Sequence, residues 1–273
     1  MEFRSHMPRL AAHAGLFALL AVVMMPALAE EPGFGIGGHV SPESYPGMTL
    51  AWREEFSAGS LDGRSWKFET GTGDEVRASN GLQYYRPDNA SVRDGFLVIT
   101  AREEPFGGRD YTSSRIVTRG LQDFRFGRIA NRAKLPRGQG MWPAMRMLGT
   151  SLDRVGWPAC GAIDIMEMAG GRGRENTVRG TLHWQQDGGH VWEGGSFTLP
   201  TGDFSEQFHV FSVTRDDSTI RWLVDGQVYL QRDISLPAFD AIREPFFLMI
   251  QLAVGGDWPG GPDGSTLFPQ RLI

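Results

Sequence analysis

The stretch "GAIDIMEMAG", residues 161–170, is an apolar run typical of a β-strand, but two acidic residues interrupt it, Asp164 and Glu167. Side chains alternate between the two faces of a strand, so Ala162 and Asp164 share one face. Glu167 has the opposite parity, and it joins that face only if a β-bulge shifts the strand by one residue. The sequence therefore predicts a bulge at Ile165–Met166, with positions 162, 164 and 167 directed into one groove.

The same alternation predicts what the two faces carry. Ile163 and one of the two bulge residues, Ile165 or Met166, are expected to face the core. On the groove face, positions 162 and 167 lie about four strand steps apart, on the order of 13 Å. If both positions carried glutamate, the side chains would bring their carboxyl groups to about 5 Å, the separation found in retaining glycosidases.

The rest of the chain consists of short β-rich runs separated by Gly, Asp, Asn and Pro. No amphipathic helix of useful length, internal repeat or internal linker interrupts them. Many short strands with frequent turn signals predict an all-β fold, an antiparallel sandwich or barrel in a single domain. The runs are found at residues 95–101, 111–118, 126–135, 178–184, 208–215, 220–226 and 245–254.

Composition narrows the classes of function. The 273 residues carry a formal net charge of -5, so nothing points to nucleic acid or an anionic membrane as a partner. Cys160 is the single cysteine of the sequence, which leaves no internal disulfide. Stability must therefore come from the hydrophobic core, and a chain of this length is large enough to build one.

The N-terminal residues have the pattern of a targeting segment. Residues 1–6 resemble a cloning leader, and the apolar run at 16–26 followed by "ALA" at 27–29 is typical of a secretory signal peptide. This run is too short to span a bilayer, and a buried core helix is the alternative. Cleavage near Ala29 predicts a secreted or periplasmic bacterial protein. Residues 30–48, rich in Gly and Pro, are expected to form a flexible segment before a domain at 49–273.

The sequence "WPACGAIDIMEMAG", residues 157–170, resembles the active-site strand of glycoside hydrolase family 16, whose laminarinase branch has the pattern Glu-x-Asp-x-x-Glu. The resemblance implies a β-jelly roll, in which two curved antiparallel sheets place a sugar-binding cleft on the concave face. It also implies a bacterial endo-β-1,3-glucanase that hydrolyses β-glucans such as laminarin by a retaining double displacement. Further segments resemble the same family, at residues 53–56, 82–85, 94–101, 111–116, 126–144, 208–213, 220–226 and 252–260.

The resemblance also assigns roles to residues. Glu167 matches the general acid/base, and Asp164 matches the helper carboxylate. The position that matches the nucleophile is occupied by Ala162, and a methyl group cannot attack an anomeric carbon, so hydrolysis is expected to be impaired. The implied cleft residues are Trp142 and Trp258, which would stack on sugar rings, Trp157 at the cleft rim, and Asn89, Arg115 and His183, which would contact the sugar.

Other positions depart from the family pattern, and these departures leave three functions open. The chain is a β-glucan hydrolase with impaired turnover, a catalytically inactive glucan-binding protein, or a glycosynthase-type variant with an intact acid/base and no nucleophile. Natural divergence and deliberate alteration are both open as causes. The chain has Gly81 and Ala130 in place of glutamate, Met145–Arg146 in place of Phe-Trp, Arg215 in place of tryptophan, and Gln251 in place of asparagine.

The expected partner is a β-glucan polysaccharide or oligosaccharide, with no nucleic acid and no membrane, bound by a monomer that requires no cofactor. The bulged spacing favours β-1,3-glucan, and cleavage of mixed 1,3-1,4 glucans is left open. Some family members hold a structural calcium ion near the first and last strands; for this chain the ion is left open, and no ligands are assigned. Relatives continue into one more strand after the position of Ile273, so the C-terminal strand is expected to be truncated, with an unpaired edge.

Overall fold

The computed structural model describes residues 37–73 and 79–273. The predicted leader and signal peptide at 1–29, and the beginning of the segment predicted to be flexible, lie outside the described residues. None of the helices in the described ranges has the length and hydropathy that a membrane span requires.

Strands dominate the described residues. The first eight are β1 (Lys67–Phe68), β2 (Gln83–Tyr85), β3 (Ala90–Arg93), β4 (Phe96–Phe106), β5 (Arg109–Ser113), β6 (Arg115–Val117), β7 (Gly127–Ala133) and β8 (Met141–Gly149). The next eight are β9 (Ala162–Glu167), β10 (Thr177–Gln186), β11 (Gly189–Thr198), β12 (His209–Arg215), β13 (Thr219–Val224), β14 (Gln227–Asp233), β15 (Phe246–Val254) and β16 (Gln270–Leu272). The helices of these ranges are short: η1 (Pro87–Asn89), α1 (Leu152–Val155) and η2 (Pro237–Arg243).

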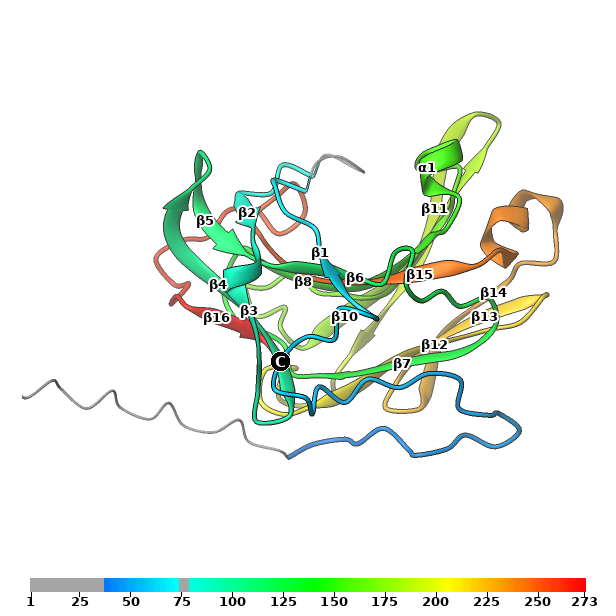
Figure 1. The fold of residues 1–273 in the computed structure, drawn as a ribbon, viewed down its shortest axis with the longest axis horizontal. Helices are drawn as coiled ribbons and strands as arrows, with labels where there is room; N and C mark the ends of the chain where they lie inside the picture. The colour runs from blue at the N-terminus through cyan, green and yellow to red at the C-terminus, as the bar shows by residue number, and fades with distance from the viewer. Residues whose placement is uncertain (1–36, 74–78) are drawn as a thin grey trace, which may run out of the picture. The chain divides into compact units, whose positions relative to one another are not determined.

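The strands form layered sheets (Figure 1). One layer is a seven-stranded sheet in the order β1-β6-β15-β8-β9-β10-β11, and a four-stranded sheet in the order β14-β13-β12-β7 faces it. A further sheet has the order β16-β4-β5-β2, with β3 paired to β4. The pairing of β2 with β5 is parallel, whereas the other pairs of named strands are antiparallel.

The main core lies between the seven-stranded and four-stranded sheets. Trp222 and Phe211 of the four-stranded sheet are almost completely buried in one cluster with Ile163 of β9. The indole nitrogen of Trp222 also donates a hydrogen bond of 2.9 Å to the carbonyl oxygen of Asp164, which joins the two sheets beneath the acidic strand. The prediction of an all-β antiparallel sandwich is confirmed.

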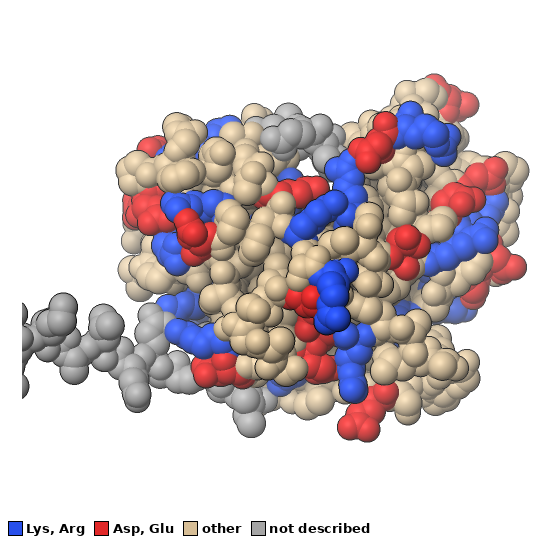
Figure 2. Space-filling model, viewed as in Figure 1, with Lys and Arg blue, Asp and Glu red and all other residues tan. Residues whose placement is uncertain are grey.

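Charged side chains lie mainly at the surface, outside this core. Figure 2 shows basic and acidic side chains interspersed over the face in view. Many of them pair locally, as Arg64 does with Asp62 at 3.0 Å, and the side chain of that arginine is 91% exposed. Exposed pairs of this kind contribute little to stability, so the buried core between the sheets must supply most of it.

The bulge in β9 lies where the sequence predicts it. In the pairing with β8, Met145 is opposite Met166 and Arg146 is opposite Asp164, so Ile165 is the extra residue. The pairing with β10 shifts at the same place. Gly180 of β10 lies at this shift, and its lack of a side chain leaves room for the core tryptophan, because an added Cβ would lie 2.4 Å from the indole of Trp222.

The bulge separates the two faces of β9. Ala162, Asp164 and Glu167 share the face away from the main core, as predicted, whereas Ile163 is completely buried in the core. The prediction that one of the two bulge residues faces the core is incomplete, because Ile165 and Met166 both belong to the core cluster. A bulge places two residues opposite one on the partner strand, so both can turn to the same side.

The two ends of the described chain are also paired. The last residues form β16, which pairs with Ile99–Ala101 of β4. Ile273 exchanges two backbone hydrogen bonds with Lys134, immediately after β7. At the other end, Gly38 forms a bridge with Phe208, immediately before β12. The segment predicted to be flexible is thus held at this point, and Figure 1 shows it running beside β7 and β12.

Candidate active site

The outer face of β9 brings two carboxylates and one arginine together. Asp164 and Glu167 are both buried, with exposed fractions of 3% and 7%. Arg146 lies opposite Asp164 on the neighbouring strand β8, and its guanidinium reaches both acids. The cluster therefore holds two acids and one cation in a region with little access to water.

Asp164 is held in its charged form. Its Oδ1 lies 3.2 Å from Nε of Arg146, and its Oδ2 lies 2.8 Å from Nε2 of His183. Burial alone would raise the pKa of this carboxyl, but the positive charge of Arg146 and the hydrogen bond from His183 outweigh burial and lower it well below its usual range. Asp164 is therefore an anion throughout the physiological range of pH.

Glu167 has the opposite tendency. Its Oε1 accepts hydrogen bonds from the guanidinium of Arg146 at 2.5 Å and from the indole nitrogen of Trp142 at 3.1 Å. Burial and the negative charge of Asp164 raise the pKa of Glu167 to about 7, and Arg146 opposes this rise only in part. A carboxyl that exchanges its proton near neutral pH is suited to general acid/base chemistry.

The surroundings of Ala162 are apolar. Ala162 is 4% exposed and belongs to a small cluster with Leu148 and Met249, against which Trp157 packs. These four residues line a pocket that encloses about 590 Å³ of space, part of it open to solvent, and Asp164 lines the same pocket. The pocket thus offers a charged aspartate, and Arg146 of its lining contacts Glu167, but position 162 offers only a methyl group.

Arg146 is the main functional residue that the sequence analysis did not assign to the site. Burial would lower the pKa of its guanidinium, but the charges of Asp164 and Glu167 outweigh burial and raise it, so the group stays positively charged. The available signal was its departure from the family pattern. The consequence could not be read from the sequence, because the ion pairs depend on the register between β8 and β9.

Two of the predicted aromatic residues, Trp142 and Trp157, line the pocket, and Trp258 contacts Trp142. Trp142 of β8 is half-buried and lies edge-on to Trp258, with 5.7 Å between the ring centroids. Trp258 is 40% exposed. The ring centroid of Trp157 lies 6.3 Å from that of His183 and 4.4 Å from that of His190. The structure therefore brings Trp142 and Trp157 into the pocket lining, whereas Trp258 lies beside Trp142 and does not line the pocket.

Arg115 also reaches the pocket, although it is largely committed to other partners. Its Nε donates to Oε1 of Gln251 at 2.9 Å, and its guanidinium lies 4.4 Å from the ring centroid of Tyr85. Glu69 forms an ion pair with it at 3.6 Å. Arg115 and Gln251 both line the pocket, so this pair is available to hydroxyl groups of a ligand.

Asn89 does not fit the predicted sugar contact. It is 1% exposed, and its amide nitrogen donates at 2.8 Å to both the carbonyl oxygen of Thr100 and Oγ1 of Thr112. It does not belong to the lining of the pocket. The amide instead joins the short helix η1 to β4 and β5, a structural use that the sequence pattern does not distinguish from sugar binding.

Trp192 is a further aromatic residue that the sequence analysis missed. It lies opposite His183 in the pairing of β10 with β11, and directly opposed residues share one face of a sheet. Its side chain is 54% exposed, and the guanidinium of Arg179 lies 4.9 Å from its ring centroid. An exposed tryptophan in the alternating stretch "HVWEG" was the available signal.

The calcium ion that the sequence left open stays an expectation. In the described ranges, three or more histidine, cysteine or acidic side chains that could share an ion are found together at His39, His209 and Asp225. Calcium prefers oxygen ligands, so a group with two imidazoles does not fit it. The calcium ion therefore stays untested, and no step of the chemistry depends on it.

Comparisons with known proteins agree with this geometry. The model of the family "Glycosyl hydrolases family 16" matches residues 79–266. A β-glucanase of Rhodothermus marinus is 36% identical over 259 residues, which cover 88% of each chain. The clotting factor G alpha subunit of Tachypleus tridentatus is 34% identical over 230 residues, which cover 83% of this chain and 33% of that protein. The chain therefore spans about a third of one relative and most of the other.

A solved structure extends the likeness to three dimensions. The laminarinase catalytic domain from Thermotoga maritima is 43% identical, with a TM-score of 0.76, and the match covers 82% of this chain and 94% of that one. The prediction of a two-sheet antiparallel β-jelly roll is confirmed by this neighbour. The matched family is the one that the motif around Asp164 and Glu167 resembles.

Proposed function

This chain belongs to glycosyl hydrolases family 16, and we propose that it has the scaffold of an endo-acting β-1,3-glucanase. Its cleft binds glucan chains and hydrolyses them slowly at most. The observation that carries the proposal is the contrast on one face of β9, where Glu167 is retained and Ala162 replaces the attacking group. Relatives named as glucanases support the substrate class.

The retaining mechanism explains why this contrast matters. One carboxylate attacks the anomeric carbon, a second carboxyl protonates the leaving oxygen, and the two groups lie about 5 Å apart. Glu167, with its pKa raised to about 7, is suited to protonate the leaving oxygen and later to activate water. Ala162 has no electron pair to form the covalent glycosyl intermediate, so the first displacement has no attacker.

Arg146 adds a second obstacle to hydrolysis. Its guanidinium donates to Oε1 of Glu167, the carboxyl that must carry a proton when the glycosidic bond breaks. A nearby positive charge favours the carboxylate over the acid, so Arg146 opposes protonation. The oxocarbenium-like transition state is itself positive, so a fixed cation beside it is unfavourable.

Sugar binding does not depend on the missing attacker. Trp142 and Trp157 line the pocket and offer aromatic surface to the apolar C–H face of a glucose ring, and the exposed Trp258 beside Trp142 extends this surface. His183 and Arg115 line the same pocket; the ring nitrogens of His183 contact Asp164 and His190, so Arg115 is the candidate donor for sugar hydroxyl groups. The cleft therefore keeps the usual composition of a ligand site, apolar walls with few convergent polar groups.

A glycosynthase-type activity is the second candidate, and one observation favours it. The proton donor Glu167 is present while position 162 is vacant of a nucleophile, so an activated donor sugar with inverted anomeric configuration could occupy the pocket. Coupling of an α-glucosyl fluoride to a laminari-oligosaccharide would form a glycosidic bond and release fluoride. A protein that only binds glucan would release none.

The remaining parts of the proposal rest on the sequence. A signal peptide cleaved near Ala29 supports a secreted or periplasmic protein. We expect a monomer without a required cofactor, and a preference for β-1,3-linked glucan over mixed 1,3-1,4 glucan. These expectations are independent of the chemistry at Ala162.

The proposal is tested by measuring binding and turnover on the same preparation. Calorimetry should show binding of laminari-oligosaccharides, and reducing-sugar release from laminarin should be orders of magnitude below that of an intact relative. Absence of binding would show that β-glucan is not the ligand of this cleft. Turnover comparable to that of an active laminarinase would show that the nucleophile is not at position 162.

A further inference from the structure

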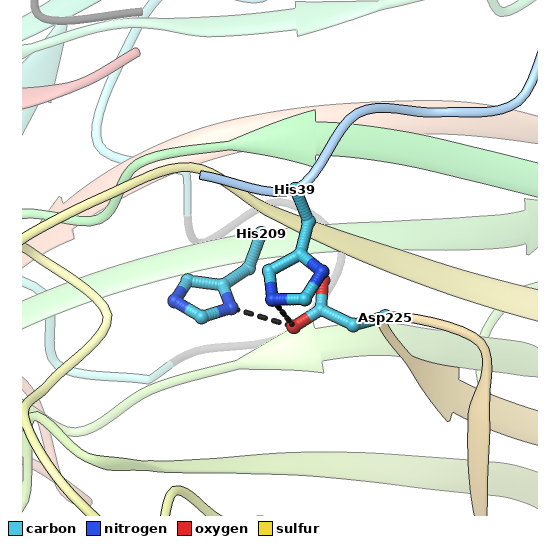
Figure 3. Close-up of side chains that lie close together, drawn as sticks. All are labelled: His39, His209 and Asp225. Carbon is cyan, nitrogen blue, oxygen red and sulfur yellow. Dashed lines mark hydrogen bonds and ion pairs between the residues drawn. The ribbon is translucent and has the colours of Figure 1, made fainter. Parts of the chain in front are cut away.

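We propose that His39, His209 and Asp225 form a binding site for a divalent transition-metal ion of the zinc class. One ligand atom from each side chain lies within 4.8 Å of the other two. Figure 3 shows the two imidazoles converging on the carboxylate of Asp225. The site lies on the four-stranded sheet and the segment that precedes β1, whereas the sugar cleft lies on the seven-stranded sheet.

The distances fit a tetrahedral ion after a small adjustment. Ligands at about 2.0–2.1 Å from zinc lie roughly 3.3–3.4 Å from one another. Nε2 of His39 lies 3.4 Å from Oδ2 of Asp225, which already matches. Nδ1 of His209 lies 2.7 Å from the same oxygen, so this contact must open by about 0.6–0.7 Å to admit the ion.

The carboxylate of Asp225 is positioned by groups outside the cluster. Its Oδ1 accepts a hydrogen bond of 2.8 Å from the backbone N–H of Val210, which leaves Oδ2 directed at the histidines. Asp225 itself is in the left-handed region, with a φ of 51°, in the turn between β13 and β14. Ligands of metal sites are commonly oriented by such outer hydrogen bonds, so Asp225 has the support that a built site requires.

Hydrogen-bond accounting also favours an ion. His209 is 2% exposed, and its Nδ1, the atom that would bind the ion, lies 2.7 Å from Oδ2 of Asp225. Oδ2 of Asp225 faces both histidines, so without an ion it must accept from each of them. One cation would satisfy all three ligand atoms at once. The competing explanation is a metal-free cluster in which His209 donates to Asp225 and His39 stacks on the ring of His209, with 5.3 Å between centroids.

The ligand types select the class of ion. Two imidazole nitrogens and one carboxylate oxygen suit zinc, cobalt or nickel, and they do not suit calcium or magnesium. The side chain of His39 is 52% exposed, so the fourth position faces water. Arg132 lies nearby, and its Nε is directed to the carbonyl oxygen of His39 at 2.8 Å. Its positive charge would weaken the affinity without blocking the ligands.

An ion at this position would hold the N-terminal segment in place. The backbone N–H of His39 donates to the carbonyl oxygen of Phe208 at 2.8 Å, so the segment already contacts the residue immediately before β12. The ion would add a link from His39 to β12 and to the β13–β14 turn. Its role would be structural, because none of its ligands lines the sugar pocket.

The site is tested with the full chain, stripped by a chelator and titrated with zinc by calorimetry near neutral pH. We expect one zinc ion per chain. At a zinc concentration about 100-fold above the dissociation constant, the melting temperature should rise by roughly 5 °C or more. Cobalt should bind at the same site and give the intense visible absorption of a four-coordinate complex. Calcium should shift neither signal.

Three variants decide the assignment. His39→Gln should fold normally because the side chain is half-exposed, and Asp225→Asn keeps a residue that tolerates a positive φ. Both should weaken zinc binding by about tenfold or more. His190→Gln is the matched control, because it removes an exposed histidine from a different histidine pair. Absence of zinc uptake by the parent chain, or uptake that is unchanged in His39→Gln, would overturn the proposal.

Discussion

Arg146 lies opposite Asp164 across the β8–β9 pair, with its Nε 3.2 Å from Oδ1 of the aspartate. The bulge in β9 brings the next acid, Glu167, to the same guanidinium at 2.5 Å. The family pattern has three acids on this strand, whereas this chain has two acids and a cation on the neighbouring strand. The centre of the cleft is therefore close to neutral, and its stability depends on Arg146.

Replacement of Arg146 should expose this dependence. In Arg146→Met the two buried acids lose their shared cation, and breaking a buried ion pair costs about 3 kcal/mol or more. We expect the free energy of unfolding to fall by about 2–3 kcal/mol at neutral pH, since Glu167 can relieve part of the cost by taking up a proton. Urea denaturation measures the change.

The control for this variant is Arg64→Ala. Arg64 pairs with Asp62 at the surface, so its removal should leave the urea midpoint unchanged. Comparison of Arg146→Met with the parent chain also tests the interaction between Arg146 and Glu167. Because Arg146 lowers the pKa of Glu167, Arg146→Met should raise that pKa further, as followed by carbon NMR of the glutamate carboxyl. A lower pKa in the variant would contradict the assigned ion pair.

Glu167 should make stability depend on pH. Burial and the charge of Asp164 raise its pKa from 4.5 to about 7, so the folded state binds this proton more tightly than the unfolded chain does. The stabilisation is complete below about pH 4.5 and is lost as the pH rises through about 7. The loss between pH 5 and 8 should be up to about 3 kcal/mol.

Glu167→Gln isolates this contribution. The amide has nearly the same shape and carries no titrating proton, so the difference in unfolding free energy between parent and variant should change with pH in the stated direction. Parallel pH profiles for the two proteins would show that Glu167 has an ordinary pKa. The lowered pKa of Asp164 acts at the acidic end, where its stabilisation is lost as the pH falls.

The aromatic residues of the cleft should contribute to glucan affinity. Trp258→Ala should weaken binding of laminari-oligosaccharides several-fold, which corresponds to about 1 kcal/mol of stacking energy. Trp142→Ala should weaken binding at least as much, because Trp142 also donates to Glu167. Phe126→Ala is the matched control, since Phe126 is 44% exposed and lies just before β7 in the opposite sheet. Unchanged affinity in both tryptophan variants would remove them from the site.

The sequence was sufficient for the fold and for the local shape of the acidic strand. Strict alternation on β9, broken once between Asp164 and Glu167, predicts the bulge because apolar residues must remain in the core and the acids must leave it. That constraint is local, so it can be read from a few neighbouring residues. The same constraint did not show that both Ile165 and Met166 turn inward, because the count of inward residues depends on the partner strands.

Contacts between distant segments could not be predicted in this way. The ion pairs of Arg146 depend on the register of β8 against β9, and the burial of Asn89 depends on the packing of η1 against β4 and β5. His39 and Asp225 are far apart in sequence, and no spacing pattern relates them. The loss of the nucleophile at position 162, by contrast, could be predicted from the sequence, because an alanine side chain cannot act as a nucleophile in any packing environment.

Restoration of a carboxylate at position 162 should raise hydrolysis. In Ala162→Glu the new side chain would project into the pocket beside Asp164, on the same face as the proton donor Glu167. We expect laminarin turnover to increase at least about tenfold, equivalent to about 1.4 kcal/mol of transition-state stabilisation. The gain should be limited, because Leu148 and Met249 surround the position with apolar groups that disfavour a charged carboxylate.

The double variant Ala162→Glu, Arg146→Trp should increase turnover further, because it also removes the cation that opposes protonation of Glu167. Azide or formate should raise turnover of the parent chain by entering the space beside Ala162 and attacking in place of the missing group. Ala162→Gln is the control, since an amide of similar size cannot act as the nucleophile and should give no gain. Reducing-sugar release, with folding checked by thermal melting, measures each variant and the formate reaction, whereas the azide reaction is followed by the glycosyl azide that it forms. If well-folded Ala162→Glu and the double variant both stay as slow as Ala162→Gln, the loss of the nucleophile is not what limits hydrolysis in this chain.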